Sequence, residues 1–272
     1  YNIKTYTQST ADNKPYEGTF TGQTEAVFPI KTSKLFTKDD YSVISTTPYG
    51  NSMVFDFAKE AIDNEDLGGR EDTDLLAISL SSTDSMGHTF GMNSIEIEDA
   101  YLRLDQELGE FLKYLDKKVG EGNYTVFLTA DHGATHNPQF LHENKIPVHP
   151  VNSPIQDDLN KVLKERFQVD NLVNSMGYNQ VRFDYKLIAE HQLDEQDMRD
   201  ICVKYLRINP EVLFVADFNK IGDASIPEEI KNRMINGHQP DRSGGIQIIF
   251  NSDVRPLTSK GSGHGNWNPD DA

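Results

Sequence analysis

Two apolar runs that flank a long amphipathic segment constrain the fold more than any other feature of this chain. The runs are residues 74–80 (DLLAISL) and 124–130 (YTVFLTA). A nearly unbroken apolar sequence of this kind is typical of strands that are buried on both faces. Between them, one apolar stripe recurs at spacings of three and four: Ile97, Tyr101, Leu104, Leu108, Phe111 and Leu115. Asn93 with Glu96 is expected to cap this helix, and Gly120 to end it. Strand, helix and strand predict a right-handed βαβ unit, and hence an α/β fold with a mostly parallel sheet flanked by helices.

The pattern changes after residue 140, where prolines interrupt the chain. Short helices are expected at 156–166, 194–207 and 227–235, and strands near 180–185, at 212–216 and at 246–250. Residues 141–245 are therefore predicted to form a smaller α+β insert or cap. The α/β core is expected to comprise residues 1–140 and 246–272, with a helix at 51–64 and mostly loops before it.

The charge balance limits the partners of the protein. Its 272 residues include 26 basic and 43 acidic side chains, which gives a net charge of −17. Nucleic-acid binding needs a basic surface, so the composition argues against it. So acidic a surface also repels phosphate esters at long range, unless bound divalent cations reverse the local field. There is no run of about 18 apolar residues, so no membrane span is expected.

A D-x-x-G-H motif follows directly on the first apolar run. Asp84 and His88 are four residues apart, and a short turn through Gly87 would bring both side chains onto one cation. In open α/β sheets, sites gather at the carboxyl ends of the strands. A carboxylate and an imidazole suit a zinc ion. Taken alone, the motif leaves a second role open, in which Asp84 caps the following turn.

An Asp–His pair follows the second apolar run in the same way. Asp131 and His132 are neighbours, whose side chains usually diverge, but Gly133 permits a sharp turn of the chain. Because one helix joins the two runs, their carboxyl ends are expected to lie close together in the sheet. An Asp and a His after each run therefore predict four metal ligands at one edge of the sheet.

A glycine-rich motif near the end of the chain supplies a fifth candidate ligand. His264 lies in the sequence GSGHG at 261–265, where the small residues let the backbone approach a metal closely. Zinc usually takes four ligands, and a catalytic zinc keeps one position open. Five ligands therefore predict two metal ions, a pair that can clamp the attacking and leaving oxygens of a phosphoryl transfer.

Together, these motifs resemble those of the alkaline phosphatase superfamily. The matching parts are D-x-x-G-H, TADHG after a strand, and the late GSGHG. The stretch SSTDSMGHTFGMNSIEIEDAYLRLD is similar to bacterial alkaline phosphatases of the single-chain, phosphate-irrepressible kind, which are related to nucleotide pyrophosphatases/phosphodiesterases. The likeness runs through the whole chain, from YTQST near the start to NWNPDDA.

The resemblance implies a role for each candidate ligand. Asp84, His88 and His264 would bind a first zinc ion, and Asp131 and His132 a second. Family members complete the second site with an Asp and a Thr or Ser nucleophile from an N-terminal segment, and some place a Lys and an Arg on the phosphate. No such segment is recognisable here, so the nucleophile is expected upstream of Tyr1 and the chain is expected to be a C-terminal fragment. The implied mechanism proceeds in two steps through a covalent phospho-enzyme.

Three interpretations of function remain open. The first is a hydrolase of small phosphate monoesters that uses two Zn²⁺ ions, or other divalent metals in their place. The second is a phosphodiesterase or nucleotide pyrophosphatase of the same superfamily. The third belongs to another class, a non-catalytic metal-binding fragment. The resemblance also implies export, and thus a periplasmic or secreted location, although the chain shows no signal peptide at Tyr1. The oligomeric state is left open.

Overall fold

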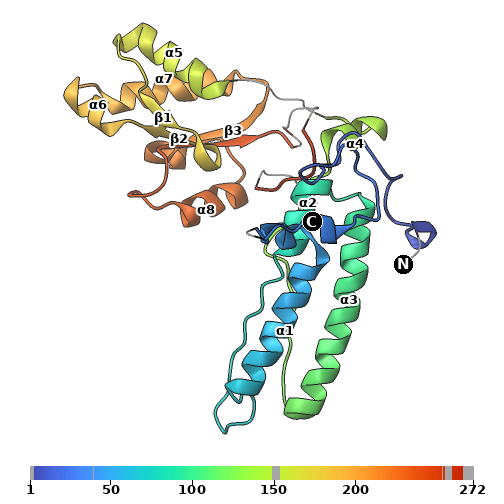
Figure 1. Ribbon diagram of the computed structural model, residues 1–272. Helices are drawn as coiled ribbons and strands as arrows, with labels where there is room; N and C mark the ends of the chain where they lie inside the picture. Colours follow the sequence, from blue (N-terminus) through green and yellow to red (C-terminus); the bar gives the residue numbers. More distant parts are fainter. Residues whose placement is uncertain (1–2, 39, 149–153, 253, 255–258, 266–272) are drawn as a thin grey trace. The chain divides into compact units, whose positions relative to one another are not determined.

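The chain divides into two compact units. The structure is a computed structural model that describes residues 3–38, 40–148, 154–252, 254 and 259–265 (Figure 1). The first unit holds the described residues up to 146 and those at 259–264, and the second holds the described residues between 147 and 254, with Gly265. Each unit has hydrophobic clusters of its own. Within the described part of the chain, no helix combines the length and apolar character that crossing a bilayer requires.

Two long helices form the body of the first unit. α1 (Pro48–Asn64) and α3 (Ile95–Leu115) run side by side in the same direction (Figure 1). Apolar residues recur at spacings of three and four on each helix, so each presents one stripe to the other. Phe55 on α1 meets Phe111 on α3, with their ring centroids 5.3 Å apart. A π-helical turn (Asp116–Gly120) extends α3 and closes at Gly120, whose φ is 103°.

Shorter elements complete the first unit. α2 (Ser82–Phe90) and α4 (Pro138–Glu143) lie here, together with 3-10 turns at Ile3–Thr5, Thr32–Lys34 and Ser42–Thr46. Met86 and Phe90 on α2 pack against Phe20 and Ile97, which ties the N-terminal segment to α2 and α3. The helix at α2 replaces the short turn through Gly87 that the sequence predicts.

The two apolar runs are extended, but neither pairs with another strand among the described residues. Each returns along the unit after its helix, residues 74–80 after α1 and residues 124–130 after α3 (Figure 1). Ile78, Leu80 and Tyr124 pack against the helices. On the other face, the side chains of Leu75 and Phe127 are 92% and 90% exposed. The runs therefore follow the predicted βαβ order, while the neighbouring strands that a parallel sheet needs are not among the described residues.

The second unit is an α+β domain built on a four-stranded antiparallel sheet. Its strands lie in the order β1 (Val173–Ser175), β2 (Gln180–Phe183), β4 (Ile246–Phe250) and β3 (Val212–Asp217). Its helices are α5 (Ile155–Phe167), α6 (Tyr185–Glu190), α7 (Glu195–Arg207) and α8 (Glu228–Gly237), with 3-10 turns at Gly177–Asn179 and Phe218–Asp223. The structure places β4 inside this sheet, although residues 246–272 are expected in the core.

The second unit has a well-packed core of its own. α5 and α7 cover the sheet with side chains that are fully buried: Leu159, Leu163, Met198, Cys202 and Leu206. Burial raises the pKa of the Cys202 thiol to about 12, so this cysteine remains a neutral apolar side chain. The Arg199 guanidinium donates to the Asp217 carboxylate at 2.8 Å, which satisfies both buried charges.

The predicted helices agree with the structure to within a few residues, but two caps differ. At α3, the Ser94 hydroxyl accepts from the Ile97 amide at 3.3 Å, so Ser94 and not Asn93 is the cap. Glu96 then lies one position too early for a capping box, and it turns into the protein interior. At α8, the sequence favours Ser225 as the N-cap, but Pro227 occupies that position, without a side-chain hydrogen bond.

Candidate metal centre

α2 presents Asp84 and His88 on one face, because residues four apart in a helix lie one above the other. Nε2 of His88 lies 3.3 Å from Oδ2 of Asp84. Nδ1 of the same ring lies 3.0 Å from the carbonyl oxygen of Ser262, so Nδ1 carries the proton and donates it. The lone pair of Nε2 is thereby left available on the side of Asp84.

His264 reaches α2 on a loop that needs glycine at one position. Gly261 has a φ of 65°, and a Cβ there would lie 1.8 Å from the carbonyl oxygen of His88. The Gly261 amide donates to the Tyr16 carbonyl at 2.8 Å, and the Ser262 amide donates to the Gly87 carbonyl at 3.0 Å. The loop is therefore held directly against the C-terminal half of α2.

The segment after Asp131 and His132 holds the loop from another side. The amide and the hydroxyl of Thr135 both donate to the Gly263 carbonyl, at 2.8 and 3.0 Å. The buried Asn137 amide group donates to the carbonyls of Ser259 and Gly261, at 3.0 and 2.8 Å. The sequence offers no local signal for these positioning residues, because each contact joins segments more than 120 residues apart.

Three candidate ligands converge. Nε2 of His264 lies 3.1 Å from Nε2 of His88 and 3.6 Å from Oδ1 of Asp84. One ligand atom from each of the three residues lies within 4.8 Å of the others. Two imidazole lone pairs that face each other at this distance repel unless a proton or a cation lies between them. The three groups therefore form a natural position for a cation.

His132 joins this group through its ring, whereas Asp131 stays outside. The His132 and His264 rings stack with centroids 3.6 Å apart. Nδ1 of His132 lies 2.9 Å from the carbonyl oxygen of Gly133, which again favours a proton on Nδ1 and a free Nε2. The Asp131 side chain is 88% exposed, although its carboxylate lies 3.5 Å from Nε2 of His132.

The donor set fits a divalent transition metal such as zinc, which binds neutral imidazole and carboxylate. Burial lowers the pKa of His264, and the adjacent His132 and His88 lower it further, against the opposing charges of Asp84 and Asp131. His264 is thereby kept neutral, the form in which it can bind a metal. The structure thus brings together four of the five predicted ligands and leaves the carboxylate of Asp131 exposed beside them.

Two further polar residues of the first unit, His136 and Thr83, have structural partners. Nδ1 of His136 lies 2.9 Å from Oδ1 of Asn93. The Thr83 hydroxyl accepts from the Asn51 amide group at 2.9 Å.

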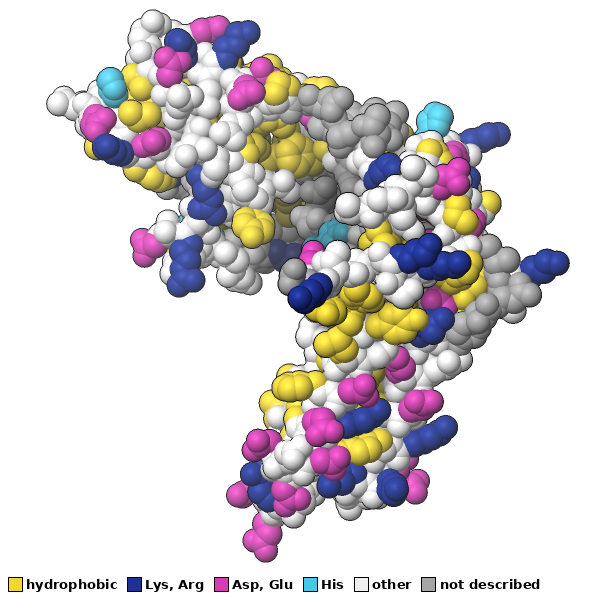
Figure 2. Space-filling model, viewed as in Figure 1, with side chains coloured by type: hydrophobic (Ala, Val, Ile, Leu, Met, Phe, Trp, Pro, Cys, Tyr) yellow, Lys and Arg dark blue, Asp and Glu magenta, His cyan; other side chains and the backbone are white. Residues whose placement is uncertain are grey.

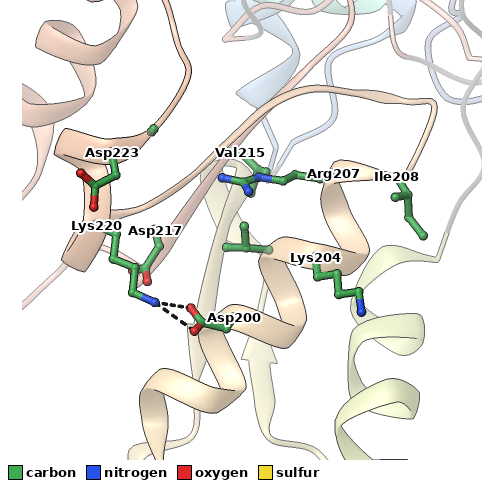
Figure 3. Close-up of a pocket in the computed structure, with 10 residues that line it drawn as sticks. Asp200, Lys204, Arg207, Ile208, Val215, Asp217, Lys220 and Asp223 are labelled. Atoms are coloured by element: carbon green, nitrogen blue, oxygen red, sulfur yellow. Dashed lines mark hydrogen bonds and ion pairs between the residues drawn. The ribbon is translucent and has the colours of Figure 1, made fainter.

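A separate pocket of about 460 Å³ lies in the second unit, between α7, β3 and the turn at Phe218–Asp223 (Figure 3). Lys220 points toward Asp200, and the two form an ion pair at 2.6 Å. Lys204 and Arg207 lie in the last turn of α7, where cations offset the partial negative charge of the helix end. The pocket contains none of the five predicted ligands.

The motifs that carry these candidate ligands agree with a family model and with a solved structure, and together these matches place the chain in the alkaline phosphatase superfamily. Members of this superfamily characteristically depend on a metal cofactor. More particularly, the chain belongs to the type I phosphodiesterase / nucleotide pyrophosphatase family, whose profile matches residues 4–269.

Three known proteins are similar over essentially the whole chain. Alkaline phosphatase PhoV of Synechococcus elongatus is 46% identical over 275 residues, and a protein of Myroides odoratus named calcium-transporting ATPase is 44% identical over 277. Alkaline phosphatase PafA of Elizabethkingia meningoseptica is 41% identical over 271 residues. The matches cover 100%, 100% and 99% of this chain but 49%, 50% and 50% of the relatives, so the chain spans about half their length.

The crystal structure of wild-type PafA has the same fold. It matches with a TM-score of 0.93 over 98% of this chain and 51% of the PafA chain, at 41% identity. The expected α/β class and the resemblance to bacterial alkaline phosphatases are thereby confirmed.

Proposed function

We propose that the protein that contains this chain is a metal-dependent phosphomonoesterase acting on small phosphate esters. The observation that carries the proposal is the convergence of Asp84, His88 and His264, whose two Nε2 atoms face each other 3.1 Å apart. Family membership supports phosphoric ester hydrolysis as the class of reaction. The names of PhoV and PafA favour monoesters. Because these relatives are about twice as long as the chain, the proposal concerns a longer protein.

The proposal assigns the candidate ligands to two zinc ions. The first ion would be held by Asp84, His88 and His264, and the second in part by Asp131 and His132. When bound, two such ions supply the positive charge that stabilises the attacking and leaving oxygens. The backbone carbonyls of Ser262 and Gly133 accept the Nδ1 protons of His88 and His132, which would leave both Nε2 lone pairs free to bind a metal ion.

The nucleophile is expected outside this chain. The Thr135 hydroxyl donates to the Gly263 carbonyl and is committed to holding the loop. In the proposed mechanism, a Thr or Ser hydroxyl of the longer protein attacks phosphorus in line, and the new O–P bond forms as the ester O–P bond breaks and the alcohol leaves. Water then hydrolyses the phospho-enzyme, which releases phosphate and restores the hydroxyl.

The choice of substrate can be tested with the zinc-loaded longer protein. We expect a higher kcat/KM for p-nitrophenyl phosphate than for bis(p-nitrophenyl) phosphate. The reverse preference would favour the second candidate, a phosphodiesterase, which the description of the family supports. Hydrolysis of neither substrate by a protein that retains its zinc would favour a non-catalytic metal-binding role.

The ligand assignment can be tested by measuring zinc content. We expect His264→Ala to lower bound zinc by about one ion per chain, because the first site would lose one of three protein ligands. His191→Ala, an exposed histidine of the second unit, is the matched control and should leave the zinc content unchanged. Unchanged stoichiometry in His264→Ala would exclude this residue from the site.

Two further expectations follow from the proposal. The 272-residue chain alone should release little or no phosphate, and robust turnover by it would show that the nucleophile lies within it.

We also expect the longer protein to be exported to the periplasm or the medium, as implied by its family. Fractionation of cells that express it from its own gene would show the protein in the cytoplasm if this expectation is wrong.

A further inference from the structure

The loop at residues 259–264 carries His264 and also orients His88. The Ser262 carbonyl of this loop lies 3.0 Å from Nδ1 of His88 and accepts its proton. The Ser262 amide donates to the Gly87 carbonyl at 3.0 Å, which holds the loop against α2. A shift of the loop would therefore disturb two of the three ligands proposed for the first ion, because it would change the position of His264 and the tautomer of His88.

Hydrophobic packing cannot fix the conformation of this loop. Its sequence is SKGSGH, which contains no apolar side chain that burial could anchor and two glycines that leave the backbone flexible. The conformation of the loop therefore depends on its hydrogen bonds.

The segment at residues 135–137 supplies many of these bonds through two buried side chains. Thr135 is 3% exposed and Asn137 is 2% exposed. The Thr135 hydroxyl and the Asn137 amide group donate to backbone carbonyls of the loop at 2.8 to 3.0 Å. The Ser262 hydroxyl donates in turn to the Thr135 carbonyl, so the two segments exchange hydrogen bonds in both directions. A bond that is lost here leaves a buried carbonyl without this donor, which is costly.

The ring of His264 is enclosed by the same two neighbours of the loop. It faces His88 of α2 on one side, with the two Nε2 atoms 3.1 Å apart, and it stacks on the ring of His132, with centroids 3.6 Å apart. His132 lies in the chain just before Thr135. The part of the chain that holds the backbone of the loop therefore also supports the His264 ring.

We propose that Thr135 and Asn137 are positioning residues of the candidate metal centre, which set the affinity for the first ion without being ligands of it. The inference rests on the proposed function, in which the three converging ligands bind that ion. Loss of the Thr135 hydroxyl leaves the Thr135 amide as a donor to the Gly263 carbonyl at 2.8 Å, so its effect is partial. Loss of the Asn137 amide group removes donors from two carbonyls, so its effect is larger.

The zinc affinity of the longer protein, measured by competition with a chelator, tests the proposal. Thr135→Val keeps the shape of the side chain and removes its hydroxyl, and we expect it to bind the first zinc about 10-fold more weakly than wild type. Asn137→Ala should weaken binding by roughly 100-fold. Thr135→Ser restores the hydroxyl and should bind zinc as wild type does.

Thr47→Val is the matched control for the loss of a buried hydroxyl. Thr47 is 2% exposed, belongs to the same unit, and donates its hydroxyl proton to the Ile44 carbonyl at 2.8 Å. It has no hydrogen bond to the loop among those that the structure describes. We expect Thr47→Val to lower the free energy of unfolding but to leave the zinc affinity unchanged.

The tautomer of His88 separates positioning from general stability. In the metal-free protein at mildly alkaline pH, nitrogen NMR of the His88 ring reports which nitrogen carries the proton. Wild type and Thr47→Val should show the proton on Nδ1, as the bond to the Ser262 carbonyl requires. Asn137→Ala should show a mixture of both tautomers, because the loop no longer holds this carbonyl in place.

Unchanged zinc affinity in both Thr135→Val and Asn137→Ala would overturn the proposal. An equal loss of affinity in Thr47→Val would also overturn it, because the effect would then follow from stability alone. In either case, a wild-type protein that binds zinc leaves the proposed function intact, whereas a wild-type protein that binds none would overturn both. If circular dichroism shows that Asn137→Ala does not fold, Thr135→Val and its rescue by Thr135→Ser decide the question.

Discussion

Gly261 has the strictest steric requirement in the candidate metal centre. Its φ of 65° is one that side-chain-bearing residues rarely adopt, and its Cα faces the backbone of His88 rather than open space. The two conditions reinforce each other, since either one alone would disfavour a larger residue. The absence of a side chain here lets His264 come within 3.1 Å of His88.

We expect Gly261→Ala to move the loop away from α2. Its Cβ would meet the carbonyl oxygen of His88 at 1.8 Å, a contact that only a backbone shift can relieve. Bound zinc should fall and the free energy of unfolding should decrease by roughly 2–4 kcal/mol, as measured by metal analysis and urea unfolding. Gly109→Ala on α3, where a Cβ meets nothing within 4 Å, is the control and should raise stability by up to about 1 kcal/mol. A Gly261→Ala protein with full zinc content and unchanged stability would contradict the steric interpretation.

The two apolar runs of the first unit leave apolar side chains exposed and backbone groups without strand partners among the described residues. Residues 74–80 and 124–130 have the composition of buried central strands, yet Leu75 and Phe127 are almost fully exposed. Figure 2 shows further hydrophobic side chains among the charged ones on the visible face of this unit. In proteins, so much exposed apolar surface beside unpaired backbone usually marks an interface. Because PafA is about twice as long, we expect the remainder of a longer protein to cover these runs.

Hydrogen exchange can test this expectation. In the 272-residue chain alone, amides of residues 74–80 and 124–130 should exchange nearly as fast as those of an unfolded peptide, because they lack strand partners. Amides in the middle of α3 provide the internal control and should be protected. The corresponding segments of intact PafA should exchange far more slowly. Slow exchange of both runs in the isolated chain would show that their backbone groups already have partners.

The longer helices were predictable because their signals are local, whereas the short helices α2, α4 and α6 were not expected. The stripe from Ile97 to Leu115 lies within the helix that it specifies, and so does the apolar pattern at 194–207. The candidate metal ligands could also be picked out from the sequence, since each sits in a short local motif: four follow the two apolar runs, and His264 lies in the glycine-rich stretch at 261–265. The bonds from Asn137 to the His264 loop were not, because they cross more than 120 positions. The burial of Glu96 was hidden for the same reason, since distant residues provide its cover.

For the molecule as a whole, two buried carboxyl groups make the free energy of unfolding depend on pH. The pKa of Glu96 and that of Glu17 are both about 7 in the folded protein, because burial disfavours the charged form, and about 4.5 when exposed. Asp12 adds negative charge to both groups, and Lys14 partly offsets it at Glu17. Between these values the folded state binds more protons, so these two groups lower the free energy of unfolding as pH rises from about 4.5 to 7.

We therefore expect Glu96→Gln, without divalent cations, to be more stable than wild type by roughly 2–3 kcal/mol at about pH 8 and nearly equal to it at about pH 5. Urea unfolding in chelator at the two pH values measures the difference. Glu110→Gln, which changes an exposed carboxyl on the same helix, should show no such dependence relative to wild type. A Glu96→Gln effect that is the same at both pH values would mean that the charge of this carboxyl is not what changes stability.

The candidate metal centre can form only late in synthesis of the chain, because its ligands are far apart in the sequence. His88 and His264 are 176 positions apart, and the second unit lies between them in the sequence. A ribosome finishes α2 well before it adds the loop that carries His264, so a nascent chain displays Asp84 and His88 without their third partner. Closing so long a loop costs roughly 4–5 kcal/mol of chain entropy, which folding of the second unit can offset by bringing the loop back. A chain released early would therefore hold metal poorly, and a firmly held ion would distinguish a finished molecule from an unfinished one.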